Sequence, residues 1–176
     1  LDLPVHEMWS YHSSSFPYRP YGMYNPKVKR DWKEVRGSAN KTGLVLWMGS
    51  NCYRTYWPRW GFALELQKHV EVDIYGECGD KRCPRKGPGA KAKCYKVMAT
   101  YKFYLSLENS ECEDYITEKL WINALNNGVV PIVYGARRKD YERLLPPNSF
   151  IYPGDYDSFK SLAAHLTELD KRPDLY

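Results

Sequence analysis

The fold is decided by the stretch Tyr101-Lys-Phe-Tyr-Leu-Ser-Leu-Glu-Asn-Ser-Glu-Cys-Glu-Asp-Tyr-Ile-Thr-Glu-Lys119. Its apolar and aromatic run over residues 103–107 is typical of a parallel strand that is covered on both faces. Asp114 is then expected to cap a helix whose first turn carries Glu118 and Lys119. Free backbone N–H groups at a helix start favour an anion, and an ammonium group beside them strengthens that preference. The stretch therefore predicts an anion-binding strand-to-helix junction in an α/β protein.

Segments on either side of this junction alternate between strand and helix patterns. Besides residues 103–107, the sequence predicts strands over residues 44–48, 70–75, 129–134 and 149–152, and helices over residues 60–69, 115–126, 137–145 and 157–171. The pair Asn127-Gly128 is expected to end the second of these helices. Strand, helix, strand spacing indicates right-handed βαβ units. The predicted fold class is α/β, with a Rossmann-like parallel sheet that places ligands at the carboxyl ends of its strands.

The composition is that of one globular domain with an irregular arm. A chain of 176 residues is long enough for a single domain, which buries roughly two thirds of its unfolded surface. Its 43% hydrophobic and 15% aromatic content argues against disorder. Residues 1–42 are rich in Pro, Ser, Tyr and charge, which predicts an irregular arm. Residues 43–176 carry the strand and helix patterns and form the predicted domain.

The net charge of +5 favours anionic partners. A nucleotide diphosphate and a nucleic acid would satisfy this charge equally well. Tyr, Lys and Arg in the Cys-containing segment could form a stacking platform for nucleic acid, but no RNA or DNA motif accompanies them, and we expect no nucleic-acid partner. No run approaches the length of an apolar membrane span, and nothing near Leu1 resembles a signal peptide. The chain as given is therefore expected to be soluble.

Cysteines at positions 52, 78, 83, 94 and 112 indicate either disulfides or a metal site. Three of them lie in a Gly- and Lys-rich segment, residues 76–97, which has little apolar content to order it. Zinc is an alternative because Cys78 and Cys83 are close in sequence, but a second close pair and a nearby His are lacking. Disulfides or a free thiol are therefore favoured over zinc, and we expect no metal. The sequon Asn40-Lys41-Thr42 agrees with an oxidising compartment.

The pairing of these cysteines is open from the sequence. A bond between Cys52 and Cys112 is attractive because both residues follow predicted strand ends. It would leave Cys78, Cys83 and Cys94 with one unpaired thiol.

Charged and polar side chains gather after three of the predicted strands. They are Ser50, Asn51 and Arg59 after the first strand, Glu108 and Asn109 after the third, and Arg137 and Arg138 after the fourth. If the sheet is parallel, these ends converge at one edge, where Lys119 and an arginine from another loop could together bind a diphosphate. Arg59 is favoured for that arginine. Arg54 is nearby, however, and either residue could equally be a solvated surface arginine.

The residues of the junction also resemble a family signature. Tyr115-Ile-Thr-Glu-Lys119, with Glu108-Asn109 before it, is similar to the signature of the α1,3/4-fucosyltransferases, inverting glycosyltransferases that use GDP-fucose. The Asn-Ser-x-Cys form after the strand, together with Asp73-Ile-Tyr-Gly-Glu-Cys-Gly79, resembles the core-type α1,3-fucosyltransferases. The resemblance covers residues 43–176. It implies the donor-binding half of a GT-B glycosyltransferase, with residues 1–42 a remnant of the acceptor domain and linker.

The resemblance also implies the site residues. Donor binding is expected from Ser50, Asn51, Arg59, Tyr104, Asn109, Tyr115, Glu118 and Lys119. Among these, Glu118 and Lys119 would contact fucose and the diphosphate. A carboxylate near the anomeric carbon lowers the barrier to an oxocarbenium-like transition state, which suits Glu118. Without the resemblance, Glu118-Lys119 could merely complement a helix dipole, and Tyr104 and Tyr115 could simply be core residues.

A general base is the second catalytic group that the resemblance implies. In the family it is a Glu in a Glu-Ser-Pro-x-His stretch, and this chain opens with Asp2-Leu-Pro-Val-His6. The predicted catalytic residues are therefore Glu118 and Asp2, although aspartate is one methylene shorter and lies near the chain terminus. Most of the acceptor domain is absent from these residues. The alternative is thus a catalytically incomplete fragment that binds a nucleotide sugar without transferring it.

The intact enzyme implied by the resemblance transfers L-fucose from GDP-β-L-fucose to O3 of an N-acetylglucosamine in a glycan, with inversion. GDP-fucose and a glycan or glycoprotein acceptor are its expected partners, and no cofactor or metal is required for donor binding. Its expected location is the lumenal side of the Golgi membrane, through an anchor that these 176 residues do not contain.

Overall fold

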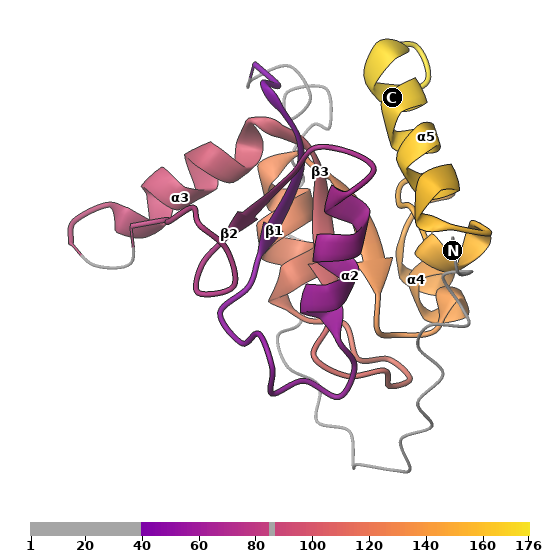
Figure 1. Cartoon of the computed structure of the whole chain (residues 1–176), viewed down its shortest axis with the longest axis horizontal. Helices are drawn as coiled ribbons and strands as arrows, with labels where there is room; N and C mark the ends of the chain where they lie inside the picture. Colours follow the sequence, from indigo (N-terminus) through magenta and orange to yellow (C-terminus); the bar gives the residue numbers. More distant parts are fainter. Residues whose placement is uncertain (1–39, 85–86) are drawn as a thin grey trace.

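The computed structural model describes residues 40–84 and 87–176 of the chain. In this part a four-stranded sheet forms the centre, with the strand order β2-β1-β3-β4. The strands are β1 (Gly43–Met48), β2 (Val72–Tyr75), β3 (Tyr101–Leu107) and β4 (Val130–Tyr134), as Figure 1 shows. All three neighbouring pairs are parallel. The predicted α/β class and the parallel sheet are confirmed, while the arm predicted over residues 1–42 lies almost entirely outside the described residues.

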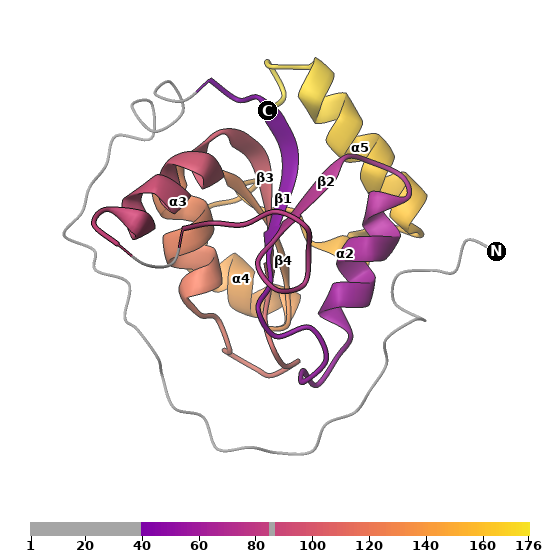
Figure 2. The same ribbon diagram turned by 60° about the vertical axis from the view of Figure 1, so that its left-hand side comes forward.

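Helices cover both faces of the sheet. They are α2 (Arg59–Gln67), α3 (Ala90–Ala99), α4 (Arg138–Leu144), α5 (Phe159–Lys171), the π-helix η1 (Lys119–Ala124) and the 3-10 helices η2 (Leu125–Asn127) and η3 (Pro153–Asp155). Figure 2 shows α3 on one side of the sheet and α2 with α5 on the other. Within the described residues, none of these helices is both long and apolar enough to span a bilayer.

Alternation along the strands explains this layering. Successive side chains of a strand point to opposite faces. Val45 and Phe103 accordingly pack in one core cluster with α2 and α5. Leu46 and Tyr104, their neighbours in sequence, pack in a second cluster with α3 and η1. Because both faces are covered, β3 is apolar almost throughout, which is the pattern that the sequence predicted.

Helix α3 was not predicted from the sequence. It occupies Ala90–Ala99, largely inside the segment 76–97, which has little apolar content. Its buried residues are Ala90, Cys94 and Met98, spaced four apart, so one narrow stripe packs on the sheet while lysines cover the rest. A stripe of one small residue, one cysteine and one methionine gives a weak periodic signal.

The helix after β3 begins later than predicted, and Asp114 does not cap it. Asp114 has a φ of 57°, in the left-handed region, and η1 starts only at Lys119. The backbone N–H of Asp114 instead donates to Oδ2 of Asp140 (3.1 Å), a buried carboxylate in the first turn of α4. Asp140 thereby ties the loop after β3 to α4. At the other end the prediction is confirmed, because Gly128 has a φ of 64° and ends η2.

The strand predicted over residues 149–152 is not formed, apart from an isolated bridge between Ile151 and Ile132 of β4. The boundaries of the other predicted strands and helices shift only slightly. The last helix begins at Phe159 because Ser158 caps it, its Oγ accepting the N–H of Ser161.

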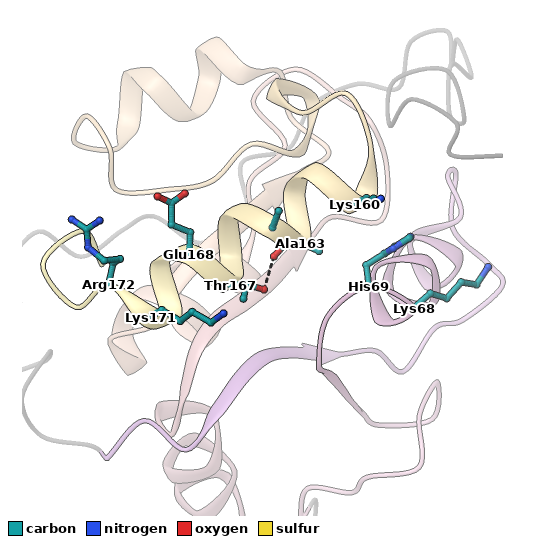
Figure 3. A pocket seen from close by; sticks show the side chains of 9 residues that line it. Lys68, His69, Lys160, Ala163, Thr167, Glu168, Lys171 and Arg172 are labelled. Atoms are coloured by element: carbon teal, nitrogen blue, oxygen red, sulfur yellow. Dashed lines mark hydrogen bonds between the residues drawn. The ribbon is translucent and has the colours of Figure 1, made fainter.

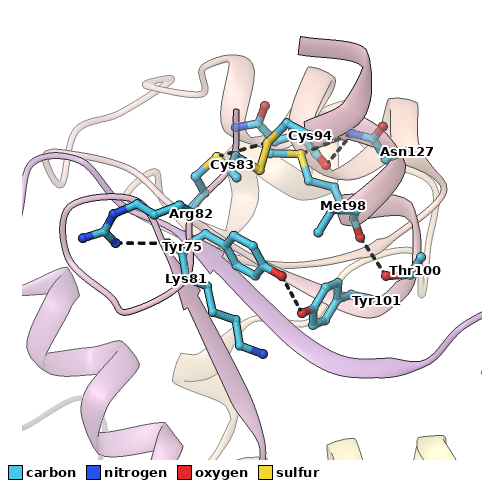
Figure 4. The surroundings of a disulfide bond; sticks show 12 residues. Tyr75, Lys81, Arg82, Cys83, Cys94, Met98, Thr100, Tyr101 and Asn127 are labelled. Atoms are coloured by element: carbon cyan, nitrogen blue, oxygen red, sulfur yellow. Dashed lines mark hydrogen bonds between the residues drawn. A yellow bond between two sulfur atoms is a disulfide. The ribbon is translucent and has the colours of Figure 1, made fainter. Parts of the chain in front are cut away.

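The disulfide predicted between Cys52 and Cys112 is wrong. Cys52 bonds to Cys78, and Cys83 bonds to Cys94, which leaves Cys112 as the free cysteine. Cys52 and Cys78 follow β1 and β2, which are neighbours in the sheet. Cys112 follows β3 and turns the other way, toward β4, where its N–H donates to the carbonyl of Gly135 (2.9 Å). Figure 4 shows the Cys83–Cys94 bond beside Met98. The zinc alternative fails because Cys78 and Cys83 belong to different disulfides.

Candidate functional site

The carboxyl edge of β3 is the place where two loops are joined. The backbone carbonyl of Glu108, directly after β3, accepts the indole N–H of Trp57 (2.8 Å). The carbonyl of Asn109 accepts the N–H of Tyr56 (2.9 Å). Both donors belong to the loop between β1 and α2. These bonds dock that loop onto the loop after β3, so that residues from the two strand ends converge as predicted.

Arg59 is a buried cation in this junction. Only 4% of its surface is exposed, and its guanidinium donates to the carbonyls of Leu107 (3.2 Å) and Asn51 (3.1 Å). The guanidinium carbon lies 5.7 Å from the ring centroid of Trp47. Burial lowers the pKa of Arg59, against the raising effect of the nearby Glu108. Its Nε is buried without a hydrogen-bond partner within the described residues, so one N–H of this charged group is unpaired.

Glu108 holds the helix start in place. Its side chain is 1% exposed, and Oε1 accepts the backbone N–H of Thr117 (2.7 Å). Oε2 accepts the Thr117 hydroxyl (2.7 Å) and the ammonium of Lys119 (2.9 Å). Lys119 is itself 13% exposed and also donates to Oγ1 of Thr117 (2.7 Å). The ammonium is thus fixed at its base while its outer side faces the surface.

Glu118 differs from Glu108 in its exposure. Its side chain is 58% exposed, and its Oε1 lies 3.4 Å from the Lys119 ammonium. Partial burial would raise the pKa of Glu118, but the charge of Lys119 and hydrogen bonds from its own backbone N–H, Thr117 and Lys119 outweigh this effect and lower it. Glu118 is therefore an ionised carboxylate at neutral pH, largely exposed at the residue directly before η1.

The two predicted tyrosines occupy different environments. Tyr104 is 1% exposed, and its hydroxyl accepts a hydrogen bond from Nδ2 of Asn123 (3.1 Å). Burial raises its pKa, and it packs in the core cluster beneath α3 and η1. Tyr115 is only partly buried, and burial raises its pKa against the lowering effect of Lys119. Tyr104 is thus a core residue, whereas Tyr115 lies near the ammonium of Lys119.

Three further predicted residues lie on the surrounding loops. Asn51 closes a turn with its side chain, since Nδ2 donates to the carbonyl of Arg54 (2.6 Å) and Oδ1 accepts the Arg54 N–H (3.0 Å). Ser50 is exposed beside it. Oδ1 of Asn109 is buried without a hydrogen-bond partner in the described part of the chain. Asn51 therefore acts through its backbone, whereas Asn109 has an unused acceptor at the strand end.

Comparison with known proteins agrees with this arrangement. Residues 38–176 match the family model described as glycosyltransferase family 10 (fucosyltransferase), C-terminal part. The chain belongs to this fucosyltransferase family. It is 45% identical over 161 residues to glycoprotein 3-alpha-L-fucosyltransferase A of Drosophila melanogaster, covering 91% of the chain and 31% of the relative. It is also 41% identical over 170 residues to alpha-(1,3)-fucosyltransferase 4 of Bos taurus. That match covers 95% of the chain and 41% of the relative.

A solved structure supports the fold of this fucosyltransferase domain. The crystal structure of an α1,3-fucosyltransferase with GDP-fucose superposes with a TM-score of 0.60 at 23% identity, covering 77% of the chain and 37% of that structure. The likeness confirms the Rossmann-like fold that the sequence predicts. The chain spans about a third to two fifths of the length of the relatives named above.

Two predicted arginines do not join the site of the fucosyltransferase domain. Arg137 pairs with Glu113, and Arg138 pairs with Glu142 and Asp155. All of these side chains are well exposed, so the pairs are surface contacts. Asp2, the predicted base, lies outside the described residues.

The sequence analysis did not assign Thr117 to the site, and it placed Glu108 at the strand end without assigning it a contact. Their positions in the sequence were suggestive, because Glu108 directly follows a buried strand and Thr117 precedes Glu118-Lys119. The sequence did not reveal that a loop of eight residues would fold back and bring the two together (residues 109–116).

The fucosyltransferase domain also has a hollow of about 780 Å³ between α2 and α5, shown in Figure 3. Lys68 and His69 line it just before β2 begins, and Lys160, Lys171 and Arg172 line it from α5. Asp170, near the end of α5, contacts Lys102 at the start of β3 (2.8 Å). The hollow therefore extends toward the amino ends of the strands, away from Arg59 and Lys119.

Proposed function

We propose that this chain is the donor-binding part of an α1,3-fucosyltransferase. The enzyme would transfer L-fucose from GDP-β-L-fucose to O3 of an N-acetylglucosamine in a glycan, with inversion. The observation that carries the proposal is the adjacent pair of Glu118 and Lys119 at the start of η1, with the buried Arg59 at the same sheet edge. The names of the relatives and the family match agree with fucose transfer.

The charges of the site suit departure of a nucleoside diphosphate. Negative charge grows on the diphosphate as the bond to fucose breaks, and a fixed cation stabilises that charge. Lys119 is held by Glu108 and Thr117 before any ligand arrives, so little reorganisation is needed. Arg59 is a second fixed cation. We assign neutralisation of the diphosphate to these two residues, with no metal required for donor binding.

Glu118 suits the sugar end of the donor. Positive charge develops at the anomeric carbon in an oxocarbenium-like transition state, and an ionised carboxylate nearby lowers its energy. The lowered pKa of Glu118 keeps it charged at neutral pH. With Glu118 facing the sugar and Lys119 facing the diphosphate, opposite charges would flank the bond that breaks. Tyr115, Asn109, Asn51, Ser50 and Tyr104 complete the donor site that we propose.

Deprotonation of the acceptor hydroxyl needs a base on the other side of the sugar. Asp2 is the candidate that this chain offers, and it would act as a general base toward O3 of the acceptor. The two disulfides agree with an oxidising compartment. We propose the lumenal side of the Golgi membrane as the location of the intact enzyme.

Calorimetric titration of the chain with GDP tests the donor site. GDP should bind, and Lys119→Ala should weaken binding roughly tenfold or more, as expected when a charged hydrogen bond is lost. Arg138→Ala is the matched control, since it removes an exposed cation outside the site. Absence of GDP binding at millimolar concentration would count against the proposal, as would equal affinities for the two variants. A transfer assay with an N-glycan acceptor then separates an active enzyme from a fragment that only binds the donor.

A further inference from the structure

The loop between β1 and α2 presents exposed aromatic side chains. Tyr53 is 79% exposed and Tyr56 is 59% exposed, the two highest values among the large apolar side chains in the described residues. Tyr53 also contacts Trp60 in the first turn of α2, with ring centroids 4.9 Å apart and the rings nearly perpendicular. A single exposed apolar residue is ordinary on a protein surface, whereas several aromatic residues gathered on one loop indicate a binding surface.

The part of the loop that carries Tyr53 is held in a fixed shape. Cys52, directly before Tyr53, forms the disulfide with Cys78. The side chain of Asn51 closes a turn through two hydrogen bonds with the backbone of Arg54. A ligand therefore meets a tyrosine whose backbone is already ordered, which lowers the entropic cost of binding.

The same loop adjoins the proposed donor site. The backbone N–H of Tyr56 donates to the carbonyl of Asn109 (2.9 Å) and so binds this loop to the loop after β3. Figure 2 shows the two loops together at one end of the sheet. Asn51 and Arg59, which we assign to donor binding, flank the two tyrosines in sequence. An acceptor must approach the anomeric carbon of the donor at this edge, so a ligand held by the tyrosines would lie next to the place of transfer.

Buried polar atoms without partners also gather at this edge. In the part of the chain that the structure describes, the side-chain atoms of this kind are Nε of Arg59, Nε1 of Trp60, Oδ1 of Asn109 and Oε1 of Glu111. All of them belong to the first turn of α2 or to the loop after β3. Native proteins contain few such atoms, and functional sites are among the places where they occur. They mark the edge as functional by an observation separate from the exposed tyrosines.

The chemistry of the tyrosine loop suits a neutral sugar. Residues 50–60 contain no Asp or Glu, so a cationic partner would find no anion there. An aromatic ring carries negative potential on its face, and the C–H groups on the face of a pyranose ring are weakly positive, so the two surfaces attract each other. The phenol of Tyr53 and the guanidinium of the exposed Arg54 supply hydrogen-bonding groups for sugar hydroxyls and for the carbonyl of an N-acetyl group.

We propose that Tyr53 and Tyr56 bind the acceptor glycan by stacking on its sugar rings, with Trp60 supporting the Tyr53 ring. The ligand class is a neutral oligosaccharide that contains N-acetylglucosamine. This inference rests on the proposed function and extends it, because it gives the donor-binding domain a part in recognition of the acceptor.

Saturation-transfer NMR of the full chain with N,N′-diacetylchitobiose, a neutral disaccharide of N-acetylglucosamine, tests this surface. Chitobiose should bind at millimolar concentration, and Tyr53→Ala should weaken binding roughly fivefold, as expected when one aromatic contact is lost. Tyr53→Phe should keep most of the affinity, because the ring remains. Leu175→Ala is the matched control, since it removes an exposed apolar side chain beyond the end of α5, and it should bind chitobiose as the unaltered chain does.

Donor and acceptor must occupy the protein together for transfer to occur. Saturating GDP should therefore leave chitobiose bound to the unaltered chain, and Tyr53→Ala should keep its affinity for GDP in calorimetric titration. Displacement of chitobiose by GDP would overturn the inference, because it would place the sugar in the donor site. Absence of chitobiose binding by the unaltered chain, or a loss in Tyr53→Ala no larger than in Leu175→Ala, would overturn it as well.

Failure of the proposed function gives a different result. GDP would then not bind, or would bind independently of Lys119, while chitobiose binding still depended on Tyr53. That result would overturn the role of the tyrosines in acceptor recognition and leave them as a glycan-binding surface.

Discussion

The ammonium of Lys119 lies 2.9 Å from Oε2 of Glu108, a carboxylate that is 1% exposed. The pair joins the end of β3 to the start of η1, beside the hydrogen bonds from Thr117 to the same carboxylate. A buried charge that loses its partner is strongly destabilising, because the remaining charge stays out of water. The pair therefore serves stability and fixes the position of the proposed diphosphate contact.

Glu108→Gln should show both effects. It removes the buried charge that pairs with Lys119 and should lower the free energy of unfolding by about 3 kcal/mol. Urea denaturation measures this loss. Glu142→Gln is the matched control: it breaks an exposed pair with Arg138 and should cost less than about 1 kcal/mol. Similar midpoints for the two variants would show that the buried pair adds nothing.

Replacement of Arg59 by Lys tests whether its fork of donors matters. A lysine keeps the charge but cannot reach the carbonyls of Leu107 and Asn51 together. We expect a loss of about 1–3 kcal/mol in stability, because a buried carbonyl loses its donor. GDP affinity should fall as well. Arg54→Lys, which changes an exposed arginine of the same loop, should alter neither quantity in the same two assays; the opposite ranking would assign the phosphate contact to Arg54.

Much of the fold follows from the sequence because the strands have a strong local signal. The buried run of β3 and the glycine that ends η2 are short-range features, and both lie where the sequence predicts. The position of Asp114 depends instead on Asp140, 26 residues away, whose carboxylate accepts a hydrogen bond from the backbone N–H of Asp114. A capping prediction made from local sequence does not include such a distant competitor.

In the site too, features with a local sequence signal were predicted and features that depend on distant contacts were not. Arg59, Glu118 and Lys119 were predicted as binding residues, and the structure gathers them at one edge of the sheet. The hydrogen bonds that Glu108 and Thr117 make around Lys119 depend on how the loop after β3 folds back. In the sequence, Arg137 and Arg138 look equally suitable for binding a diphosphate. The structure shows instead that they pair with exposed acidic side chains. Disulfide partners depend on the paths of the loops, because β1 neighbours both β2 and β3. The N–H of Cys78 donates to the carbonyl of Gly49 in the loop after β1, whereas the N–H of Cys112 donates to that of Gly135 after β4.

Mass mapping of unreduced peptides should recover Cys52 with Cys78 and Cys83 with Cys94, and an alkylating reagent should label Cys112. The Cys52–Cys78 bond closes the longer loop, with a sequence separation of 26 against 11. By the chain-entropy model, loss of the longer cross-link should cost about 3.5 kcal/mol of stability and loss of the shorter one about 2.8 kcal/mol. Recovery of a Cys52–Cys112 peptide would contradict the structure directly.

Glu111 gives the protein a specific dependence of stability on pH. Burial raises its pKa, against the lowering effect of a hydrogen bond with the Tyr134 side chain, and its buried Oε1 has no hydrogen-bond partner within residues 40–84 and 87–176. The folded protein therefore binds the proton of Glu111 more tightly than the unfolded chain does. This stabilisation is complete below the unfolded pKa of about 4.3 and is lost as the pH rises through the folded pKa.

Glu111→Gln should remove this dependence, since glutamine stays neutral at every pH. The variant should gain stability relative to the unaltered chain between pH 4 and pH 7, because the ionised, poorly solvated carboxylate is then absent. Thermal melts across this range measure the difference in Tm, which should widen with pH and then level off. Glu142→Gln, at an exposed position, controls for the general effect of removing a negative charge. Parallel curves for Glu111→Gln and the unaltered chain would mean that Glu111 titrates alike in the folded and unfolded states.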